Sequence, residues 1–154
     1  MKDFVYDIPT KVYFGKTALT HVGEELSRFG HKVLLVYGGG SIKRTGLYDR
    51  LIAQFKACQL DWVELPGIEP NPRIQSVRQG AALCKEQGWD MVLAAGGGSC
   101  MDAGKFIAAG ACVDFDPWDF ISKHLPLTKA LPILTIPTMA ATGSEMNPTV
   151  VISN

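Results

Sequence analysis

One stretch constrains this chain more than any other: a buried-type strand that runs into three glycines and continues as a helix. Met91 to Ala95 is apolar throughout, as in a parallel strand covered on both faces. Gly96-Gly-Gly-Ser99 follows, and a helix is expected from about Ser99 to Ala111. A helix that begins in this way presents unpaired N–H groups and the positive end of its dipole, which together favour a phosphate group.

The rest of the chain repeats the alternation of strand and helix. Further apolar runs begin near residues 33, 61 and 133, and helical periodicity separates them. This order predicts an α/β fold over residues 1–154, a Rossmann-like, doubly wound and mostly parallel sheet with helices on both faces. Short strands are also expected at 11–15 and 149–154, and a short helix or turn at 116–121.

A second glycine triplet follows the strand expected at 32–37, and it consists of Gly38, Gly39 and Gly40 with Ser41 after them. Ligands of parallel sheets bind beyond the carboxyl ends of the strands, so both triplets are expected at the ligand-binding edge. Neither triplet completes the usual Gly-x-Gly-x-x-Gly fingerprint, because Lys43 and Met101 stand where the third glycine would fall.

Two interpretations of the second triplet remain open. Glycine lets a pyrophosphate approach the backbone, so Gly97, Gly98 and Ser99 are candidates for binding a dinucleotide. The alternative is a tight turn without any ligand. Cys100 begins the same helix and is expected to be a packed thiol rather than a reactive one.

Composition excludes several other classes of protein. Lys plus Arg and Asp plus Glu number 15 each, so no basic excess supports binding to nucleic acid or to an anionic membrane. The four cysteines form no Cys-x-x-Cys pair and have no histidine at zinc-site spacing, so we expect reduced thiols. The N-terminus has no signal-peptide pattern. We therefore expect a cytoplasmic protein with no membrane segment.

Several motifs in a fixed order resemble one enzyme family, the iron-containing (group III) alcohol dehydrogenases. The motifs are Gly38-Gly-Gly-Ser41, Pro70-Asn71-Pro72, Gly96-Gly-Gly-Ser-x-x-Asp102-x-x-Lys105, Asp116-Pro-Trp118 and Ala141-Thr-Gly-Ser-Glu145. They extend over essentially the whole chain and are most similar to the butanol dehydrogenase and NADPH-dependent aldehyde reductase branch. The resemblance implies hydride transfer between a nicotinamide cofactor and an alcohol or aldehyde.

The same resemblance assigns roles to further residues. It implies that Asn71 contacts the adenosine portion of the cofactor and that Asp102 reaches a ribose or the nicotinamide. It also implies that a loop lines the phosphate and nicotinamide-ribose region through Thr138, Thr142, Ser144 and Asn147. From spacing alone, Asp102 could equally be a helix-start charge paired with Lys105, and the loop residues could be turn and cap residues.

The family's divalent metal, Fe or Zn, is implied to bind a C-terminal helical domain that this chain does not contain. We find no candidate catalytic residue and no metal ligand, since His21, His31 and His124 are scattered. The chain alone is therefore expected to have no dehydrogenase activity. The resemblance further implies that the strand expected at 11–15 can pair with a second copy in a homodimer.

The first triplet bears on the choice of cofactor. NAD-specific sites usually place an acid on the ribose 2′-hydroxyl, whereas here Ser41, Lys43 and Arg44 follow the glycines and no acid is adjacent in sequence. This predicts NADPH. NADH stays open, because Glu64 and Glu69 lie about one strand–helix unit further on.

Two other functions remain as alternatives. One is the nucleotide domain of a glycerol dehydrogenase or a dehydroquinate synthase-like enzyme, which shares the Gly-Gly-Gly-Ser-x-x-Asp core. The other is a nucleotide-binding module without catalysis.

Overall fold

A four-stranded parallel sheet forms the centre of the protein. The computed structural model describes residues 8–154. The strands are β1 (Lys32–Tyr37), β2 (Asp61–Leu65), β3 (Met91–Gly96) and β4 (Ile133–Pro137), in the order β2-β1-β3-β4. The predicted parallel α/β fold is confirmed, and each of these strands begins within one residue of its expected start.

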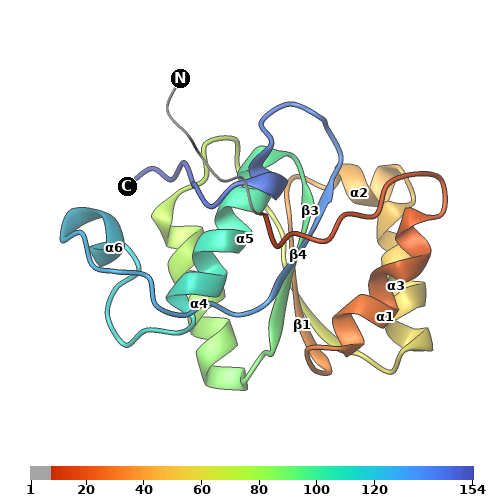
Figure 1. The fold of residues 1–154 in the computed structure, drawn as a ribbon, viewed down its shortest axis with the longest axis horizontal. Helices are drawn as coiled ribbons and strands as arrows, with labels where there is room; N and C mark the ends of the chain where they lie inside the picture. The colour runs from red at the N-terminus through yellow and green to blue at the C-terminus, as the bar shows by residue number, and fades with distance from the viewer. Residues whose placement is uncertain (1–7) are drawn as a thin grey trace.

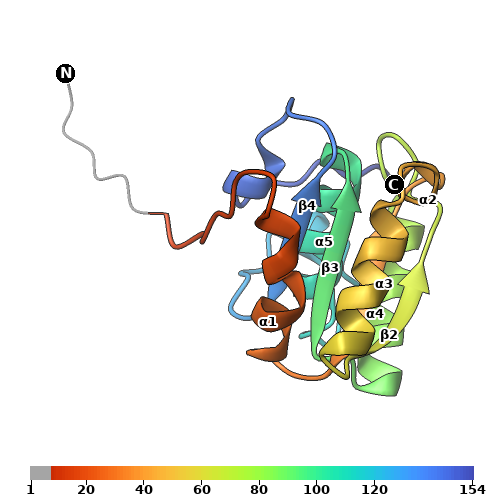
Figure 2. The same cartoon turned by 90° about the vertical axis from the view of Figure 1, so that its right-hand side faces the viewer.

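Helices cover both faces of the sheet, as Figures 1 and 2 show. On one side lie α1 (Val22–Ser27) and α3 (Leu47–Ala57), and on the other α4 (Ile74–Gln87) and α5 (Gly98–Gly110). The remaining helical segments are short: η1 (Ala18–His21), α2 (Ser41–Arg44), α6 (Asp119–Ser122) and η2 (Ser144–Met146). Within residues 8–154, no helix has the length and hydropathy needed to cross a membrane.

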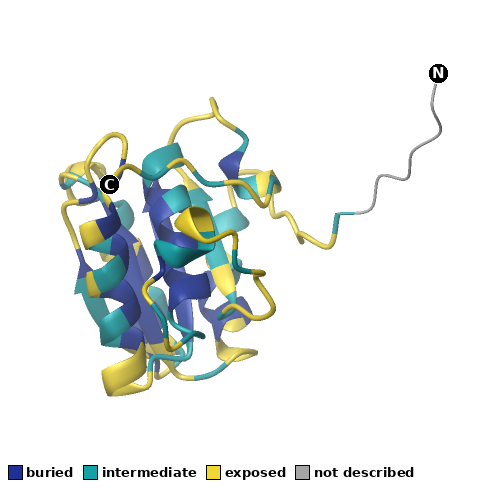
Figure 3. Cartoon of the chain, turned by 90° about the vertical axis from the view of Figure 1, so that its left-hand side faces the viewer, coloured by how far each residue is buried: buried dark blue, intermediate teal, exposed yellow. Residues whose placement is uncertain are grey.

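The two central strands explain why this arrangement is stable. Every residue of β3 and all but the first of β1 are buried, so both faces of each strand contribute apolar side chains (Figure 3). Leu34 and Val36 pack with the helices α4 and α5, whereas Val33 and Leu35 pack with α1 and α3. Burial of a side chain of this size contributes about 1.5–3 kcal/mol, so the two clusters hold the layers together.

The chain changes direction across the sheet between β1 and β3. From β1 the chain proceeds to β2 on one side, and α4 then carries it back to β3 on the other side of β1. Parallel sheets bind ligands at such a switch point, beyond the carboxyl ends of the strands. Both glycine triplets follow these two strands, so they meet at this point, at the top of Figure 1.

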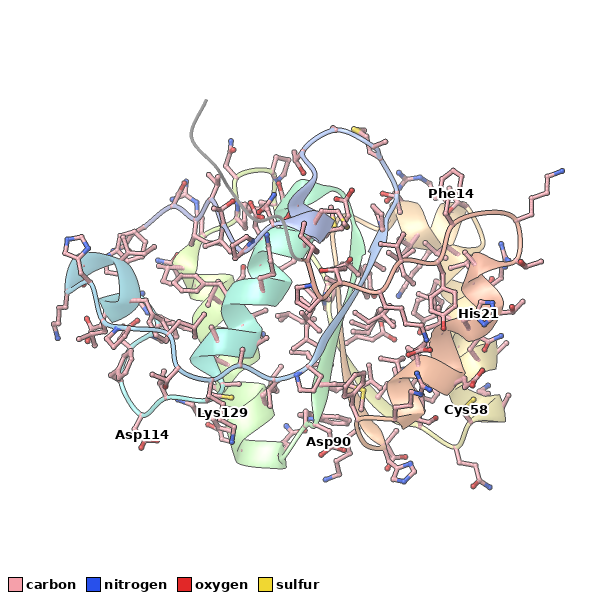
Figure 4. All side chains as sticks on the ribbon, in the orientation of Figure 1. Phe14, His21, Cys58, Asp90, Asp114 and Lys129 are labelled. Carbon is pink, nitrogen blue, oxygen red and sulfur yellow. The ribbon has the colours of Figure 1, made fainter. Side chains whose placement is uncertain are left out.

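At the amino ends of the strands, the carboxylate of Asp90 links β1 to β3. Asp90 lies at the foot of the sheet in Figure 4 and accepts hydrogen bonds from the N–H groups of His31 and Lys32, at 2.9 and 3.0 Å. These hydrogen bonds connect the amino ends of β1 and β3, at the end of the sheet opposite the glycine turns.

Two predicted strands are wrong. Residues 11–15 pair with no strand within the described chain; Lys11 and Tyr13 instead hydrogen-bond the carboxylate of Glu25, and Phe14 is fully exposed (Figure 4). Residues 149–154 make one isolated bridge, between Ser153 and Arg73. Both segments have the apolar pattern of strands, but within residues 8–154 neither joins the four-stranded sheet. The short helix expected near 116–121 is present as α6.

Candidate functional site

The second glycine turn ends β3 and starts the 13-residue helix α5. Gly97 caps this helix with its carbonyl, which accepts hydrogen bonds from the N–H groups of Cys100 and Met101 at 3.0 and 3.3 Å. Within residues 8–154 the N–H groups of Gly98 and Ser99 have no acceptor, and no side chain caps the helix. The helix start therefore has free donors and a positive dipole end, as an anion requires.

The reason for glycine differs from one position of this turn to the next. A Cβ on Gly96 would lie 2.5 Å from the Cys100 sulfur, and one on Gly98 would lie 2.6 Å from the hydroxyl of Thr142. At Gly97 a Cβ would meet nothing within 4 Å, and its φ of −80° suits any residue. Neither packing nor backbone conformation within the described chain thus explains the glycine at position 97.

The first glycine turn ends β1 and starts the four-residue helix α2. Gly40 has a φ of 92°, in the left-handed region that favours glycine. Gly39 has neither a positive φ nor any atom within 4 Å of where its Cβ would be, so it resembles Gly97. The exposed Ser41 follows as the first residue of α2.

The loop after β2 packs directly on the first turn. The N–H of Gly67 donates to the carbonyl of Gly38 at 3.2 Å, and that of Ile68 donates to Tyr37 at 3.1 Å. Three residues further on, Asn71 is exposed and holds a left-handed φ of 55°. The Pro-Asn-Pro loop therefore lies at the same edge of the sheet as the first glycine turn. The contact of Asn71 with the adenosine portion of a cofactor stays a prediction.

Asp102 lies one turn into α5, and its carboxylate binds several neighbours. Its Oδ1 accepts a hydrogen bond from the Ser144 hydroxyl at 2.6 Å and lies 3.3 Å from the Lys105 ammonium. Its Oδ2 accepts a hydrogen bond from the N–H of Val151 at 3.0 Å. The structural alternative for this residue, pairing with Lys105, is thus observed, and Ser144 shares the same carboxylate.

The other predicted loop residues lie around the start of α5. The N–H of Thr138 donates to the carbonyl of Gly96 at 2.9 Å, which joins the loop to the second glycine turn. Thr142 lies against Gly98. Asn147 uses its amide inside the loop, since Nδ2 donates to the carbonyl of Gly143 at 2.8 Å and Oδ1 accepts from Thr149. Of these residues, Thr142 therefore lies directly beside the start of α5, and Asn147 lies within the loop that follows β4.

An acid that is not adjacent to the first turn in sequence lies close to it in the fold: Glu64, one of the two acids that kept NADH open as an alternative. The Glu64 carboxylate is 3.5 Å from the Lys43 ammonium and accepts hydrogen bonds from the hydroxyls of Tyr37 and Tyr48. Burial pushes the pKa of Glu64 upward, but the two tyrosines and Lys43 outweigh it and leave that pKa below its ordinary value. Glu64 is therefore a carboxylate at neutral pH that offsets the charge of Lys43. The other acid considered, Glu69, pairs with Arg73 at 3.9 Å.

Cys100 is a packing residue, as expected. It is buried between the two glycine turns, and a Cβ on Gly38 would lie 3.6 Å from its sulfur. Burial raises the pKa of the Cys100 thiol, which leaves it protonated and unreactive at neutral pH.

Residues 8–154 contain no group of three or more His, Cys, Asp or Glu side chains able to hold a metal ion. Two surface hollows lie away from the glycine turns. One, of about 330 Å³, is mainly apolar and is lined in part by Phe106, Phe120 and Leu131; the other, of about 230 Å³, lies beside Arg50 and Gln54. The free N–H groups at the glycine edge are donors of the kind that bind phosphate groups.

The fold and the two glycine turns define a class of α/β protein with a ligand edge at the β1/β3 switch point, and comparison with known proteins identifies the family. The model of the iron-containing alcohol dehydrogenases matches residues 9–154, so the chain belongs to the iron-containing alcohol dehydrogenase family. The resemblance seen in the sequence motifs is thereby confirmed.

Individual relatives agree with this assignment. NADH-dependent butanol dehydrogenase A of Clostridium acetobutylicum is 52% identical over the whole chain, and NADPH-dependent aldehyde reductase YqhD of Escherichia coli is 38% identical over 99% of it. The crystal structure of NADH-dependent butanol dehydrogenase A from Thermotoga maritima superposes with a TM-score of 0.96 at 42% identity, and this chain corresponds to 39% of it. The chain spans about 40% of the length of the two relatives compared by sequence.

Two features of the site were not recognised from the sequence. In the sequence, Lys105 was named only as part of the family motif and as the partner of Asp102, yet it also binds the loop after β4. Tyr37 and Tyr48 were not considered beside Glu64. Tyr37 and Glu64 lie at the ends of adjacent strands, so the sheet order would have suggested that contact.

Proposed function

We propose that this chain is the nicotinamide-dinucleotide-binding part of a metal-dependent alcohol dehydrogenase or aldehyde reductase. The observation that carries the proposal is the pair Gly39 and Gly97. Each is a glycine with open space where a side chain would be and no backbone strain, and the two follow neighbouring strands at the switch point. A ligand that approaches the backbone at both places accounts for them.

The shape of a dinucleotide suits this pair of turns. The N–H groups of Gly98 and Ser99, at the positive end of the longer helix, would donate to the pyrophosphate. The first turn, with Ser41 and the exposed Asn71, would contact the adenosine portion. Thr138, Thr142 and Ser144 would border the nicotinamide ribose, as the family resemblance implies.

We further propose NADH as the preferred cofactor, in place of the NADPH suggested by the sequence. Lys43 was to supply charge for a 2′-phosphate, but the Glu64 carboxylate lies 3.5 Å from it and would repel that phosphate. Relatives of both kinds exist, since butanol dehydrogenase A is named NADH-dependent and YqhD NADPH-dependent.

The reaction itself needs groups that the described residues lack. In the proposed enzyme, hydride passes between the nicotinamide and the substrate carbon, and a metal supplies a Lewis acid for the substrate oxygen. Residues 8–154 hold no metal site, so we assign to this chain only the binding and orientation of the cofactor. Formation of a homodimer and the identity of the alcohol or aldehyde likewise stay predictions.

Calorimetric titration of the 154-residue chain with NADH and with NADPH tests the proposal. We expect both to bind, NADH more tightly, and we expect no reduction of butanal by the chain alone. Binding of neither, by a chain that melts cooperatively, would contradict the proposed function. Tighter binding of NADPH would contradict only the preference for NADH.

A further inference from the structure

Lys105 has an environment that its place in the sequence does not explain. It lies two turns into α5, and only 15% of its side chain is exposed. Its ammonium donates to the carbonyl of Ser144 at 3.0 Å, to the carbonyl and Oδ1 of Asn147 at 3.2 and 3.3 Å, and to the carbonyl of Thr149. A lysine that only balanced Asp102 on the helix surface would not need these acceptors.

Asp102 binds the same segment through both of its carboxylate oxygens. Ser144, which is 4% exposed, donates its hydroxyl to Asp102, and the N–H of Val151 donates to the second oxygen. Together these contacts form a latch that joins α5 to the segment after β4. We use the name latch for Asp102, Lys105, Ser144, Asn147, Thr149 and Val151.

The latch determines the conformation of a segment that has little regular structure of its own. Between η2 and the end of the chain the backbone makes one isolated bridge, so its polar groups need partners elsewhere. The ammonium group has three donors and is surrounded by oxygens from three residues of the segment. Without it, the carbonyls of Ser144 and Asn147 lose the partner that holds them over α5.

The position of this segment matters at the start of the helix. Thr142 precedes the latch by two residues, and its hydroxyl lies so near Gly98 that no side chain would fit there. The N–H of Ser144 also donates to this hydroxyl at 3.3 Å. The latch therefore fixes the wall beside the free N–H groups of Gly98 and Ser99.

We propose that Lys105 is a positioning residue for the dinucleotide: it binds the loop after β4 and thereby holds Thr142 and Ser144 against the pyrophosphate site. Lys105 does not touch the cofactor itself. The inference rests on the proposed function, since it assumes a dinucleotide at the second glycine turn. Because the contacts of the latch join α5 to the segment after β4 and none of them involves Ser41, Lys43 or Glu64, its loss should weaken NADH and NADPH equally.

The test compares Lys105→Met with the unsubstituted chain by calorimetric titration and by amide hydrogen exchange. We expect both dinucleotides to bind about tenfold more weakly, because small displacements of a positioned group have effects of this size. Exchange should rise in residues 142–151 and stay unchanged in β1 and β3. Lys105→Arg keeps the charge and several donors, and should restore part of the affinity.

Lys32→Met is the matched control. Lys32 also donates to a backbone carbonyl, that of Gln87 at 3.1 Å, but lies at the opposite edge of the sheet. Its substitution should leave both dissociation constants unchanged. If Lys105→Met does not fold, the same titrations and exchange measurements are made on Asn147→Ala. This substitution removes an oxygen that Lys105 binds, at a half-buried position.

Three outcomes overturn the inference. Dissociation constants that stay within about twofold while exchange rises in residues 142–151 would mean that the position of the loop does not matter for binding. A change in the ratio of NADH to NADPH affinity by more than about threefold would place the effect at the adenosine end. If the unsubstituted chain binds neither dinucleotide, the proposed function fails, and the inference fails with it.

Discussion

The two glycine turns share the sequence Gly-Gly-Gly-Ser and follow neighbouring strands, but they differ in the helix that follows, in backbone conformation and in nearby charge. The turn at Gly38 leads into a helix of four residues, needs a left-handed glycine at position 40, and lies beside the charged pair Lys43 and Glu64. The turn at Gly96 leads into a helix of 13 residues, and the latch holds a loop against it. The same four-residue motif therefore lies in two different local environments.

The difference shows what each turn can contribute to binding. A long helix has a developed dipole and free N–H groups, which bind a diphosphate whatever base or sugar is attached to it. A four-residue helix provides little dipole, so in the proposed site the first turn would act through Ser41, Lys43 and Glu64. The second turn is thus suited to affinity for any dinucleotide, and the first to discrimination between dinucleotides.

The largest effect is expected from a side chain at the second turn. Gly97→Val places a side chain where the protein leaves open space, so it should block the pyrophosphate and weaken both dinucleotides about 100-fold, or about 2.7 kcal/mol. The melting temperature should stay within about 3 °C, because the substitution disturbs no contact. Calorimetry and a thermal melt measure the two quantities, and unchanged affinity in a folded variant would contradict the role of this turn.

The corresponding change at the first turn should be smaller and selective. Gly39→Val also enters open space, without backbone strain. We expect about a tenfold loss of affinity, unequal between NADH and NADPH, since only the adenosine portion is affected. Equal losses of 100-fold in both variants, by the same titration, would remove the distinction between the turns.

Glu64→Gln should shift the preference without abolishing binding. The substitution removes the charge that offsets Lys43, and the ratio of NADPH to NADH affinity should rise about fivefold. Glu69→Gln is the control, because Glu69 is exposed and pairs with Arg73 in the loop rather than with Lys43. An unchanged ratio in Glu64→Gln would show that Lys43 does not face the 2′-position.

The smallest effect concerns acid stability. The pKa of Glu64 lies below its ordinary value of 4.5, so this carboxylate stabilises the fold above that pH. The contribution is lost as the pH falls through the lowered pKa. Melting temperatures measured from pH 7 to pH 3 should therefore fall less steeply for Glu64→Gln than for the unsubstituted chain. Equal slopes would mean that the tyrosines and Lys43 do not stabilise the ionised form.

The strands and the position of the two glycine turns could be predicted from the sequence, whereas two further strand predictions were wrong. The short apolar runs before Gly38 and Gly96 predicted buried parallel strands. Since ligands bind beyond the carboxyl ends of such strands, the runs also predicted the ligand-binding edge. The segments at 11–15 and 149–154 also had strand patterns, but strand formation needs an edge to pair with, which local pattern does not report.

Contacts between distant residues set the other limit. The pairing of Asp102 with Lys105 spans three residues and follows from helix geometry. The bonds from Lys105 to Ser144 and Asn147 span 39 and 42 residues, and that of Lys43 to Glu64 spans 21, so they depend on how β4 and β2 are placed. The latch and the ion pair between Lys43 and Glu64 therefore could not be predicted from the sequence.

The most direct measurement is the change in backbone amide chemical shifts of the 154-residue chain as NADH is added. Binding at the second glycine turn predicts the largest shifts at Gly97, Gly98 and Ser99, with smaller shifts at Gly39 and Ser41. Shifts confined to the apolar hollow beside Phe106 and Phe120, with the glycine amides unmoved, would contradict the assignment of the two turns as the cofactor site.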